Sequence, residues 1–289
     1  MTTPATIPSI PLNWGAQVRA SVLYRRAQAA ADFWATEEDR YQLWLAHNDY
    51  VEKTMAVLSP KLRVGDRLLD VGGGSGALAL PMSEKVRLVT ALDPSAALCH
   101  QLLDAAAAAG RPNIAVLLAP LEAVPEGFGF VESSIVAHTF ETVPEPQELL
   151  HKLFRCSRRN LLLIVGSGDP HPLQQQIWKR FRKADYPAPP GLPAMLGLLR
   201  EVGFRPVVET FTTTDNLVYR GLDDAVEQWA AELALDGAAV DRTALRRSLQ
   251  VWLAPVEATE GGSPSHEGGT LLGVRSMTAR AIVTCWPGE

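Results

Sequence analysis

Four glycines and an aspartate share one short turn, Asp70-Val-Gly72-Gly73-Gly74-Ser75-Gly76, between an apolar run and a helical pattern. Glycines let the chain bend sharply and let a ligand approach main-chain atoms that a Cβ would block. A turn without a ligand is disfavoured, because four glycines weaken a fold. The glycines alone do not choose the ligand, since Gly72, Gly74 and Ala77 also satisfy the GxGxxA dinucleotide fingerprint.

The aspartate separates the two cofactor classes that use such turns. In a dinucleotide site the pyrophosphate would lie over the turn and would be repelled by Asp70, since unit charges about 4 Å apart interact by about 1 to 4 kcal/mol in wet surroundings. S-adenosylmethionine instead brings a sulfonium and an ammonium group, which a nearby carboxylate attracts. The D-x-G-x-G-x-G spacing that ends at Gly76 therefore favours S-adenosylmethionine as the cofactor.

The segment from Leu69 to Pro81 resembles motif I of class I S-adenosylmethionine-dependent methyltransferases, of the broad type-11-like group, and the likeness extends from about Phe33 to Thr214. The resemblance implies a Rossmann-like sheet and implies that Asp93, in Ala-Leu-Asp-Pro-Ser95, binds the two ribose hydroxyls. A carboxylate suits a cis-diol, although the same pairing occurs with NAD. The cofactor-binding residues implied at these two strand ends are Asp70, Gly72, Gly73, Gly74, Gly76, Asp93 and Pro94.

Two further loops complete the resemblance. After the third predicted strand, proline stands where the family commonly has aspartate, so the Leu121 amide and the Glu122 carboxylate are the predicted adenine contacts, with a surface role for Glu122 as the alternative. After the fourth strand, Ala137 to Val143 matches the loop beneath the methionine end of the cofactor, which places His138 there. The N/D-P-P-Y/F motif of many base and amide methyltransferases is absent.

His138 is also the candidate catalytic base. A neutral imidazole can accept a proton at physiological pH, and a loop after strand four lies near the transferring methyl group. The alternative, packing against the cofactor or a local hydrogen bond, is favoured by the rarity of catalytic histidines. Glu141 is a weaker candidate, and Asp169 and His171 follow the fifth strand at the same edge of the sheet.

The elements that would position these residues alternate as βαβ units. Short apolar runs predict parallel strands, and a last run predicts an antiparallel seventh strand; the runs are 67–71, 86–92, 114–118, 133–137, 160–165, 205–214 and 278–286. The expected fold is thus an α/β, Rossmann-like seven-stranded sheet with helical additions in the N-terminal part and the C-terminal half. The expected division is a helical cap over 1–58, a cofactor-binding core over 59–215, and a helical insertion with the final strand over 216–289.

The composition narrows the substrate. With 27 basic and 32 acidic residues among 289, the net charge is −5 and the pI is about 5.7, which favours a small molecule over nucleic acid. Cys99, Cys156 and Cys285 lie far apart with no CxxC pair, so neither a zinc site nor a disulfide framework is indicated. No membrane span or secretory signal is recognised, which predicts a cytoplasmic protein.

The sequence thus predicts an S-adenosylmethionine-dependent methyltransferase that acts on a small molecule by in-line displacement. A protein base is needed for a hydroxyl or a protonated amine acceptor and not for a thiolate. Two alternatives stay open. An NAD(P)-dependent oxidoreductase would be stabilised by nicotinamide dinucleotides, and a catalytically silent cofactor-binding protein would show no turnover. The acceptor and the oligomeric state are left undetermined by the sequence.

Overall fold

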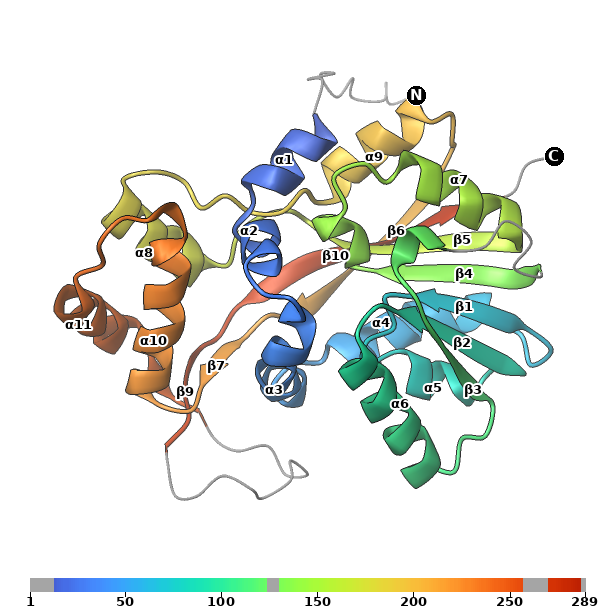
Figure 1. Cartoon of the computed structure of the whole chain (residues 1–289), viewed down its shortest axis with the longest axis horizontal. Helices are drawn as coiled ribbons and strands as arrows, with labels where there is room; N and C mark the ends of the chain where they lie inside the picture. The colour runs from blue at the N-terminus through green and yellow to red at the C-terminus, as the bar shows by residue number, and fades with distance from the viewer. Residues whose placement is uncertain (1–12, 124–129, 257–269, 287–289) are drawn as a thin grey trace, which may run out of the picture.

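A seven-stranded sheet runs through the centre of the computed structural model, which describes residues 13–123, 130–256 and 270–286. The strand order is β3-β2-β1-β4-β5-β10-β6 (Figure 1). The strands are β1 (Arg67–Val71), β2 (Leu88–Asp93), β3 (Ile114–Leu118), β4 (Val131–Ala137), β5 (Ser157–Gly166), β6 (Val207–Thr214) and β10 (Met277–Cys285). Strand β10 lies between β5 and β6 and is antiparallel to both, whereas β1 to β5 pair in parallel. The predicted sheet with an antiparallel last strand is confirmed.

Helices cover both faces of this sheet because its central strands are apolar on both sides. In β5, Leu161, Leu163 and Val165 pack with one layer of helices, whereas Leu162 and Ile164 pack with the other. The first layer is α1 (Trp14–Ala20), α7 (Gln147–Cys156) and α9 (Leu192–Glu201). The second is α4 (Tyr50–Leu58), α5 (Ala79–Ser83) and α6 (Ala96–Ala108).

The additions form a third packed cluster beside the sheet, at the left of Figure 1. It contains α8 (Pro172–Arg182), α10 (Leu222–Leu233) and α11 (Arg242–Trp252), and a small sheet of β7 (Leu217–Tyr219), β9 (Leu272–Val274) and β8 (Ala254–Pro255). Between this cluster and the sheet lie α2 (Val22–Gln28) and α3 (Phe33–Ala46). The 3-10 segments are η1 (Ser59–Lys61), η2 (Leu121–Ala123), η3 (Thr139–Thr142) and η4 (Ala234–Asp236).

One helix is shorter than its sequence pattern indicates, for a local reason. The pattern that follows the glycine turn predicts a helix from Ala77 to Lys85, but only the five residues of α5 are helical, because the glycine turn continues through its start and Pro81 limits its hydrogen bonding. The helical pattern from Leu222 to Leu235 agrees better, since α10 begins at Leu222 and Tyr219 ends β7. The predicted loop at 260–269 lies outside the described residues.

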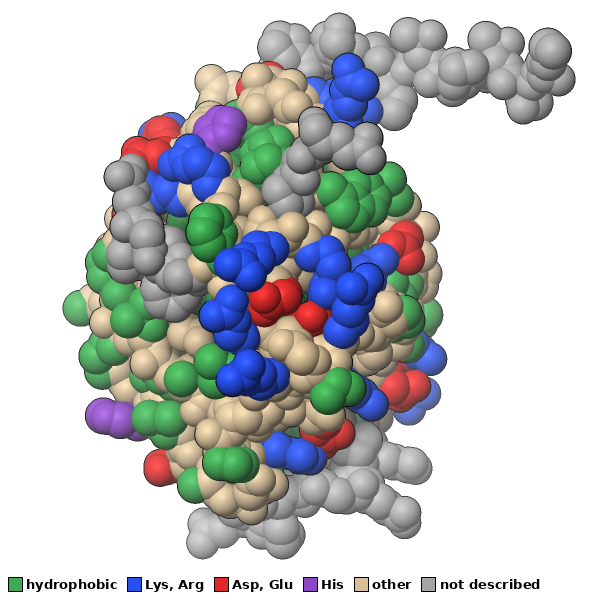
Figure 2. All heavy atoms as spheres, turned by 90° about the vertical axis from the view of Figure 1, so that its right-hand side faces the viewer, with side chains coloured by type: hydrophobic (Ala, Val, Ile, Leu, Met, Phe, Trp, Pro, Cys, Tyr) green, Lys and Arg blue, Asp and Glu red, His purple; other side chains and the backbone are tan. Residues whose placement is uncertain are grey.

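The two ends of the parallel strands differ in how their charges are paired. At the amino ends, Arg67 pairs with Glu132 and Arg159 pairs with Asp66. Figure 2, which turns the right-hand side of Figure 1 toward the viewer, shows Lys and Arg side chains around acidic ones. At the carboxyl ends, by contrast, Asp70 and Asp93 belong to no ion pair among the described residues. Across the described ranges, no helix is both long and apolar enough for a membrane crossing.

Close packing of two loops next to the sheet yields a first prediction. A Cβ on Gly191, at the start of α9, would lie well inside 3.0 Å of backbone atoms of Ser167 and Gly168, whereas a Cβ on Gly197 would meet nothing within 4 Å. We expect Gly191→Ala to lower the free energy of unfolding by about 1–3 kcal/mol. The matched Gly197→Ala, within α9, should be neutral or stabilising by up to about 1 kcal/mol. Urea denaturation measures both, and equal effects would contradict the packing argument.

Candidate functional site

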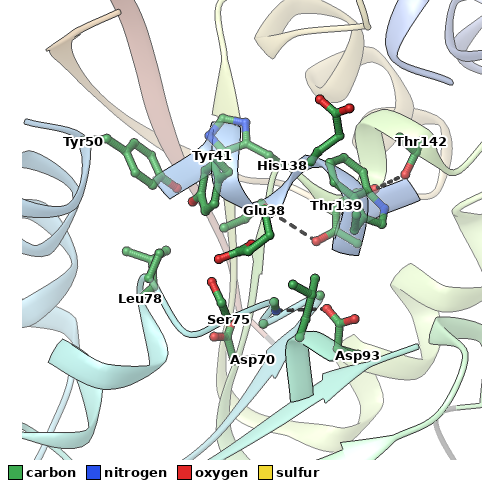
Figure 3. A pocket seen from close by; sticks show the side chains of 18 of the residues that line it. Glu38, Tyr41, Tyr50, Asp70, Ser75, Leu78, Asp93, His138, Thr139 and Thr142 are labelled. Atoms are coloured by element: carbon green, nitrogen blue, oxygen red, sulfur yellow. Dashed lines mark hydrogen bonds between the residues drawn. The ribbon is translucent and has the colours of Figure 1, made fainter. Parts of the chain in front are cut away.

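A cavity of about 540 Å³ opens at the carboxyl ends of the parallel strands, under α2 and α3. Its size falls in the range of about 300–1,000 Å³ that is common for small-molecule sites. The predicted residues Asp70, Asp93 and His138 all line it, although they lie at the ends of three different strands. Figure 3 shows the cavity with Asp70 and Ser75 on one side and with Glu38 and Tyr41 on the other. The residues of the predicted site that line it are Asp70, Gly72, Gly73, Gly74, Asp93, Pro94, Leu121 and His138.

The glycine turn has the shape that its sequence predicts. Gly72 has φ +72°, and a Cβ there would collide with the side chain of Thr139, which donates a hydrogen bond to the Val71 carbonyl at 2.9 Å. Gly74 has φ +54° and nothing within 4 Å of where its Cβ would be. The left-handed backbone and the close approach of Thr139 require glycine at the first position, whereas the second leaves open space for a ligand. Gly76 is buried and does not line the cavity.

Asp70 is buried at 2 % exposure and forms no ion pair with any described residue. Burial, reinforced by the charge of Asp93, raises the pKa of Asp70 to about 7. Its carboxyl group is therefore held in a place that disfavours its own negative charge at neutral pH. A cation delivered into the cavity would relieve that cost.

Asp93 is fixed by the turn itself. Its Oδ2 accepts from the Gly74 N–H at 2.9 Å and its Oδ1 accepts from the Ser95 N–H at 2.9 Å. Burial raises the pKa of Asp93, while these two backbone hydrogen bonds oppose the rise. The carboxylate is thus oriented before any ligand arrives, which is what recognition of a diol requires.

Further acids line the same cavity from outside the glycine turn. Glu38 on α3 is 8 % exposed and accepts from Gln42 Nε2 at 2.6 Å, and Gln42 also donates to Ser75 Oγ at 3.2 Å. Asp215 follows β6 and accepts from Trp44 Nε1 at 3.2 Å. Within the described ranges, Asp70, Asp93, Glu38 and Asp215 have no Lys, Arg or His within ion-pair distance. The cavity is therefore an acidic environment with unpaired carboxylates.

Aromatic side chains from the predicted N-terminal cap close the cavity. Tyr41 and Trp44 stack with ring centroids 5.9 Å apart, and Trp44 lies 5.6 Å from Tyr50. Burial raises the pKa of both tyrosines, so their hydroxyls stay protonated at neutral pH. An apolar wall of this kind lowers the local dielectric and strengthens the interactions of the acids opposite it.

His138 is held in a specific state between two charged residues. Its backbone is left-handed with φ 58°, a conformation that costs a non-glycine residue energy and that here aims the ring across the cavity. Its Nδ1 lies 2.7 Å from Glu141 Oε1, and its Nε2 lies 2.9 Å from Arg280 Nη1. Arginine has no acceptor, so Nε2 accepts and Nδ1–H donates, which assigns a neutral imidazole. The lone pair that a catalytic base would use is therefore occupied by Arg280.

The remaining predicted residues separate into two groups. Glu122 is exposed and does not line the cavity, and its backbone carbonyl accepts from Lys152 Nζ at 3.2 Å. Asp169 and His171 line a second cavity of about 260 Å³ beyond the ends of β5 and β10. The two cavities share four lining residues, namely Leu23, His138, Asp215 and Arg280.

Four charged residues that line the cavity were not predicted from the sequence: Glu37, Glu38, Asp215 and Arg280. Arg280 carried a usable signal, because it is the one charge inside the otherwise apolar run from Ala279 to Val283. Asp215 comes directly after a strand, close to a strand end as Asp70 and Asp93 are, and could have been found by the same rule. Glu37 and Glu38 carried no such signal, since a glutamate on a helix is ordinarily solvated.

Comparison with known proteins agrees with this geometry. Residues 69–165 match the family model described as "Methyltransferase domain". The search of curated proteins found no match. Among solved structures, a candidate methyltransferase from Bacillus halodurans C-125 is 14 % identical, with a TM-score of 0.53 over 81 % of this chain and 99 % of that one. The magnesium protoporphyrin IX methyltransferase of Synechocystis PCC 6803, solved with bound SAH, is 18 % identical, with a TM-score of 0.52 over 65 % and 92 % of the two chains.

At these identities the solved structures show the same fold, and the family model covers β1 through most of β5 together with the glycine turn. The residues that it spans include the acids at the ends of β1 and β2 and the histidine after β4. Residues 69–165 accordingly form a methyltransferase domain, and the chain has the fold of the solved methyltransferases.

Proposed function

We propose that the chain transfers the methyl group of S-adenosylmethionine to a small-molecule acceptor by in-line displacement. The observation that carries the proposal is the set of unpaired acids around the glycine turn, with Asp70 buried and its pKa raised to about 7. A donor with sulfonium and ammonium groups compensates these charges, whereas the pyrophosphate of an NAD(P)-dependent oxidoreductase would be repelled by them.

The donor would lie along the strand ends in a definite direction. Asp93, already oriented by two backbone hydrogen bonds, would take the ribose hydroxyls, and Leu121 with Pro94 would border the adenine. Asp70 would face the positively charged end. Glu122 stays a predicted adenine contact, although it is exposed and would have to turn inward.

Alignment is the main contribution that the protein would make to the reaction. The donor supplies an already activated methyl group, and its sulfur leaves with the electron pair of the broken S–C bond as the acceptor atom forms the new bond. The aromatic wall of Tyr41, Trp44 and Tyr50 would exclude water from that line. His138 fits a positioning role better than the predicted role of base, because Arg280 occupies its Nε2.

A binding experiment tests the donor class and the role of Asp70. We expect the wild-type protein to be stabilised in thermal shift by S-adenosylmethionine and its demethylated product and not by NAD or NADP. Asp70→Asn should weaken S-adenosylmethionine about tenfold or more in calorimetry, because a charge-assisted contact is lost. The control is Asp39→Asn, whose side chain is 88 % exposed and which should bind as wild type does. Stabilisation by NAD alone would contradict the proposal.

The pH dependence of donor binding gives a sharper test. Because the pKa of Asp70 is about 7 without ligand and a cation favours its charged form, binding should release a proton below that pH. S-adenosylmethionine should therefore bind more tightly from pH 6 to 7.5 and level off above. The demethylated product, which lacks the sulfonium charge, should change less. In Asp70→Asn the dependence should flatten, and an unchanged slope in that variant would assign the effect to another group.

The Asp70 carboxyl group should also make the stability of the ligand-free protein depend on pH, with a contribution that falls as the pH rises. A folded-state pKa raised above the unfolded value means that the contribution of Asp70 to stability is largest below pH 4 and is lost as the pH rises through about 7. Without ligand, Asp70→Asn should therefore gain Tm over wild type as the pH goes from 5 to 8. A constant Tm difference across that range would argue against the raised pKa.

Turnover separates an enzyme from a protein that only holds the cofactor. We expect S-adenosylhomocysteine to accumulate when the protein and donor are mixed with at least one member of a panel of small amines, amino acids, thiols and phenols. The reaction is followed by chromatography, with Asp70→Asn as the matched control at the same donor concentration. Tight donor binding with no product from any acceptor would favour the silent alternative.

A further inference from the structure

Two opposite charges lie where the two cavities meet. Arg280 and Asp215 each line both cavities. Among the described residues neither belongs to an ion pair, and they do not pair with each other within 4.0 Å. A cation and an anion that share a junction without contact leave room for a ligand that pairs with both.

Arg280 is the more constrained of the two. Arg280 lies on β10 and is only 9 % exposed. Its Cζ lies 4.8 Å from the centroid of the Tyr50 ring and 5.6 Å from the centroid of the Trp44 ring. Its Nε donates to Thr213 Oγ1 at 2.9 Å and its Nη1 donates to His138 Nε2 at 2.9 Å. Glu141 does not contact Arg280 directly and is linked to its positive charge only through the neutral His138. A guanidinium has five N–H donors, so three have no partner in the described parts of the chain.

Asp215 is held with one oxygen engaged. Its Oδ1 accepts from Trp44 Nε1 and its backbone N–H donates to the Ser276 carbonyl at 2.9 Å. His171 lies near Asp215. Burial lowers the pKa of His171, and the charge and the backbone carbonyl of Asp215 partly oppose this change. The aspartate is therefore fixed in place, with capacity left to accept from a donor in the cavity.

A buried arginine without a carboxylate is costly to fold unless a ligand supplies one. A polyanion is disfavoured, because Glu141, Asp169 and Glu232 also line the second cavity. The other arginine that lines it, Arg26, is already paired with Glu37 and Glu232. Resting on the proposed function, we propose that the second cavity is the acceptor site and that the acceptor is a small zwitterion, with its carboxylate on Arg280 and its ammonium group on Asp215.

The methionine part of the donor is itself a zwitterion and is the competing occupant of this pair. With the donor ribose at Asp93, at the end of β2, five strand spacings separate it from β6, which Asp215 follows, so the two backbone positions are about 24 Å apart. The side chains of Arg280 and Asp215 shorten this distance by reaching back to His138 and Trp44. A separate molecule beside the donor fits the pair better, because the methionine chain would have to span most of the sheet to contact Arg280 and Asp215 together.

The experiment uses the full-length protein saturated with S-adenosylhomocysteine. Calorimetry measures the binding of α-, β- and γ-amino acids, each compared with its amide and with the matching acid that lacks the amino group. At least one zwitterion should bind, and both analogues should bind about tenfold more weakly or worse, because each leaves one charge unpaired. Arg280→Met and Asp215→Asn should each weaken that zwitterion about tenfold, and Arg280→Lys should retain part of the affinity. Arg220→Met, outside both cavities, should bind as wild type does.

The variants and ligands of this experiment distinguish failure of the zwitterion proposal from failure of the proposed function. Weaker binding of S-adenosylhomocysteine to Arg280→Met, with unchanged binding of 5′-methylthioadenosine, would assign the arginine to the donor carboxylate and overturn the proposal. So would the absence of any zwitterion binding, or unchanged affinity in both variants. If the wild-type protein binds neither S-adenosylmethionine nor its product, the proposed function itself fails.

Discussion

A carboxyl group removed from water at the end of β1 is the constraint around which the rest of the site is arranged. Asp70 is 2 % exposed, and its nearest charged influence, Asp93, makes its ionisation harder. A fold that keeps such a group without a cationic partner gives up stability in the absence of ligand. The proposed positively charged donor would restore that stability by filling the cavity, so that binding and electrostatic relief would be the same event.

The surrounding architecture keeps that charge unpaired. Ion pairs such as Arg67 with Glu132 lie at the amino ends of the strands, whereas the arginine at the carboxyl ends is directed to a neutral histidine and to aromatic faces. His138 lies between Arg280 and Glu141 and forms a hydrogen bond with each, so the two charged groups do not pair directly. The arrangement prevents the acids and the guanidinium from cancelling each other before a ligand arrives.

The parts of the fold that could be predicted are those with strong local patterns. Strands β1 and β3 have the predicted bounds, because buried parallel strands are continuous apolar runs between clear turns. The glycine turn and the acids at Asp70 and Asp93 follow from spacing alone. The small sheet of β7, β9 and β8 could not be predicted, since strands of two or three residues show no periodicity.

The cavity residues outside the glycine turn were harder to predict for a different reason. Glu38, Asp215 and Arg280 come from a helix, a loop after β6 and the last strand, and only the fold brings them to one cavity. His138 was placed correctly by its strand end, but its occupied nitrogen depends on a partner 142 positions along the chain. Long-range contacts of that kind leave no trace in a local pattern.

The position of β10 has a consequence for how the molecule is assembled. Because this strand lies between β5 and β6, the half of the sheet that carries Asp70, Asp93 and His138 can pair while the chain is still being synthesised, whereas β6 has no neighbour in the sheet until residues 277–285 emerge. The cofactor end of the cavity thus belongs to the early part of folding and the Arg280 end to its last step. A ribosome-bound intermediate would carry the nucleoside pocket before it carried a complete wall for a second ligand.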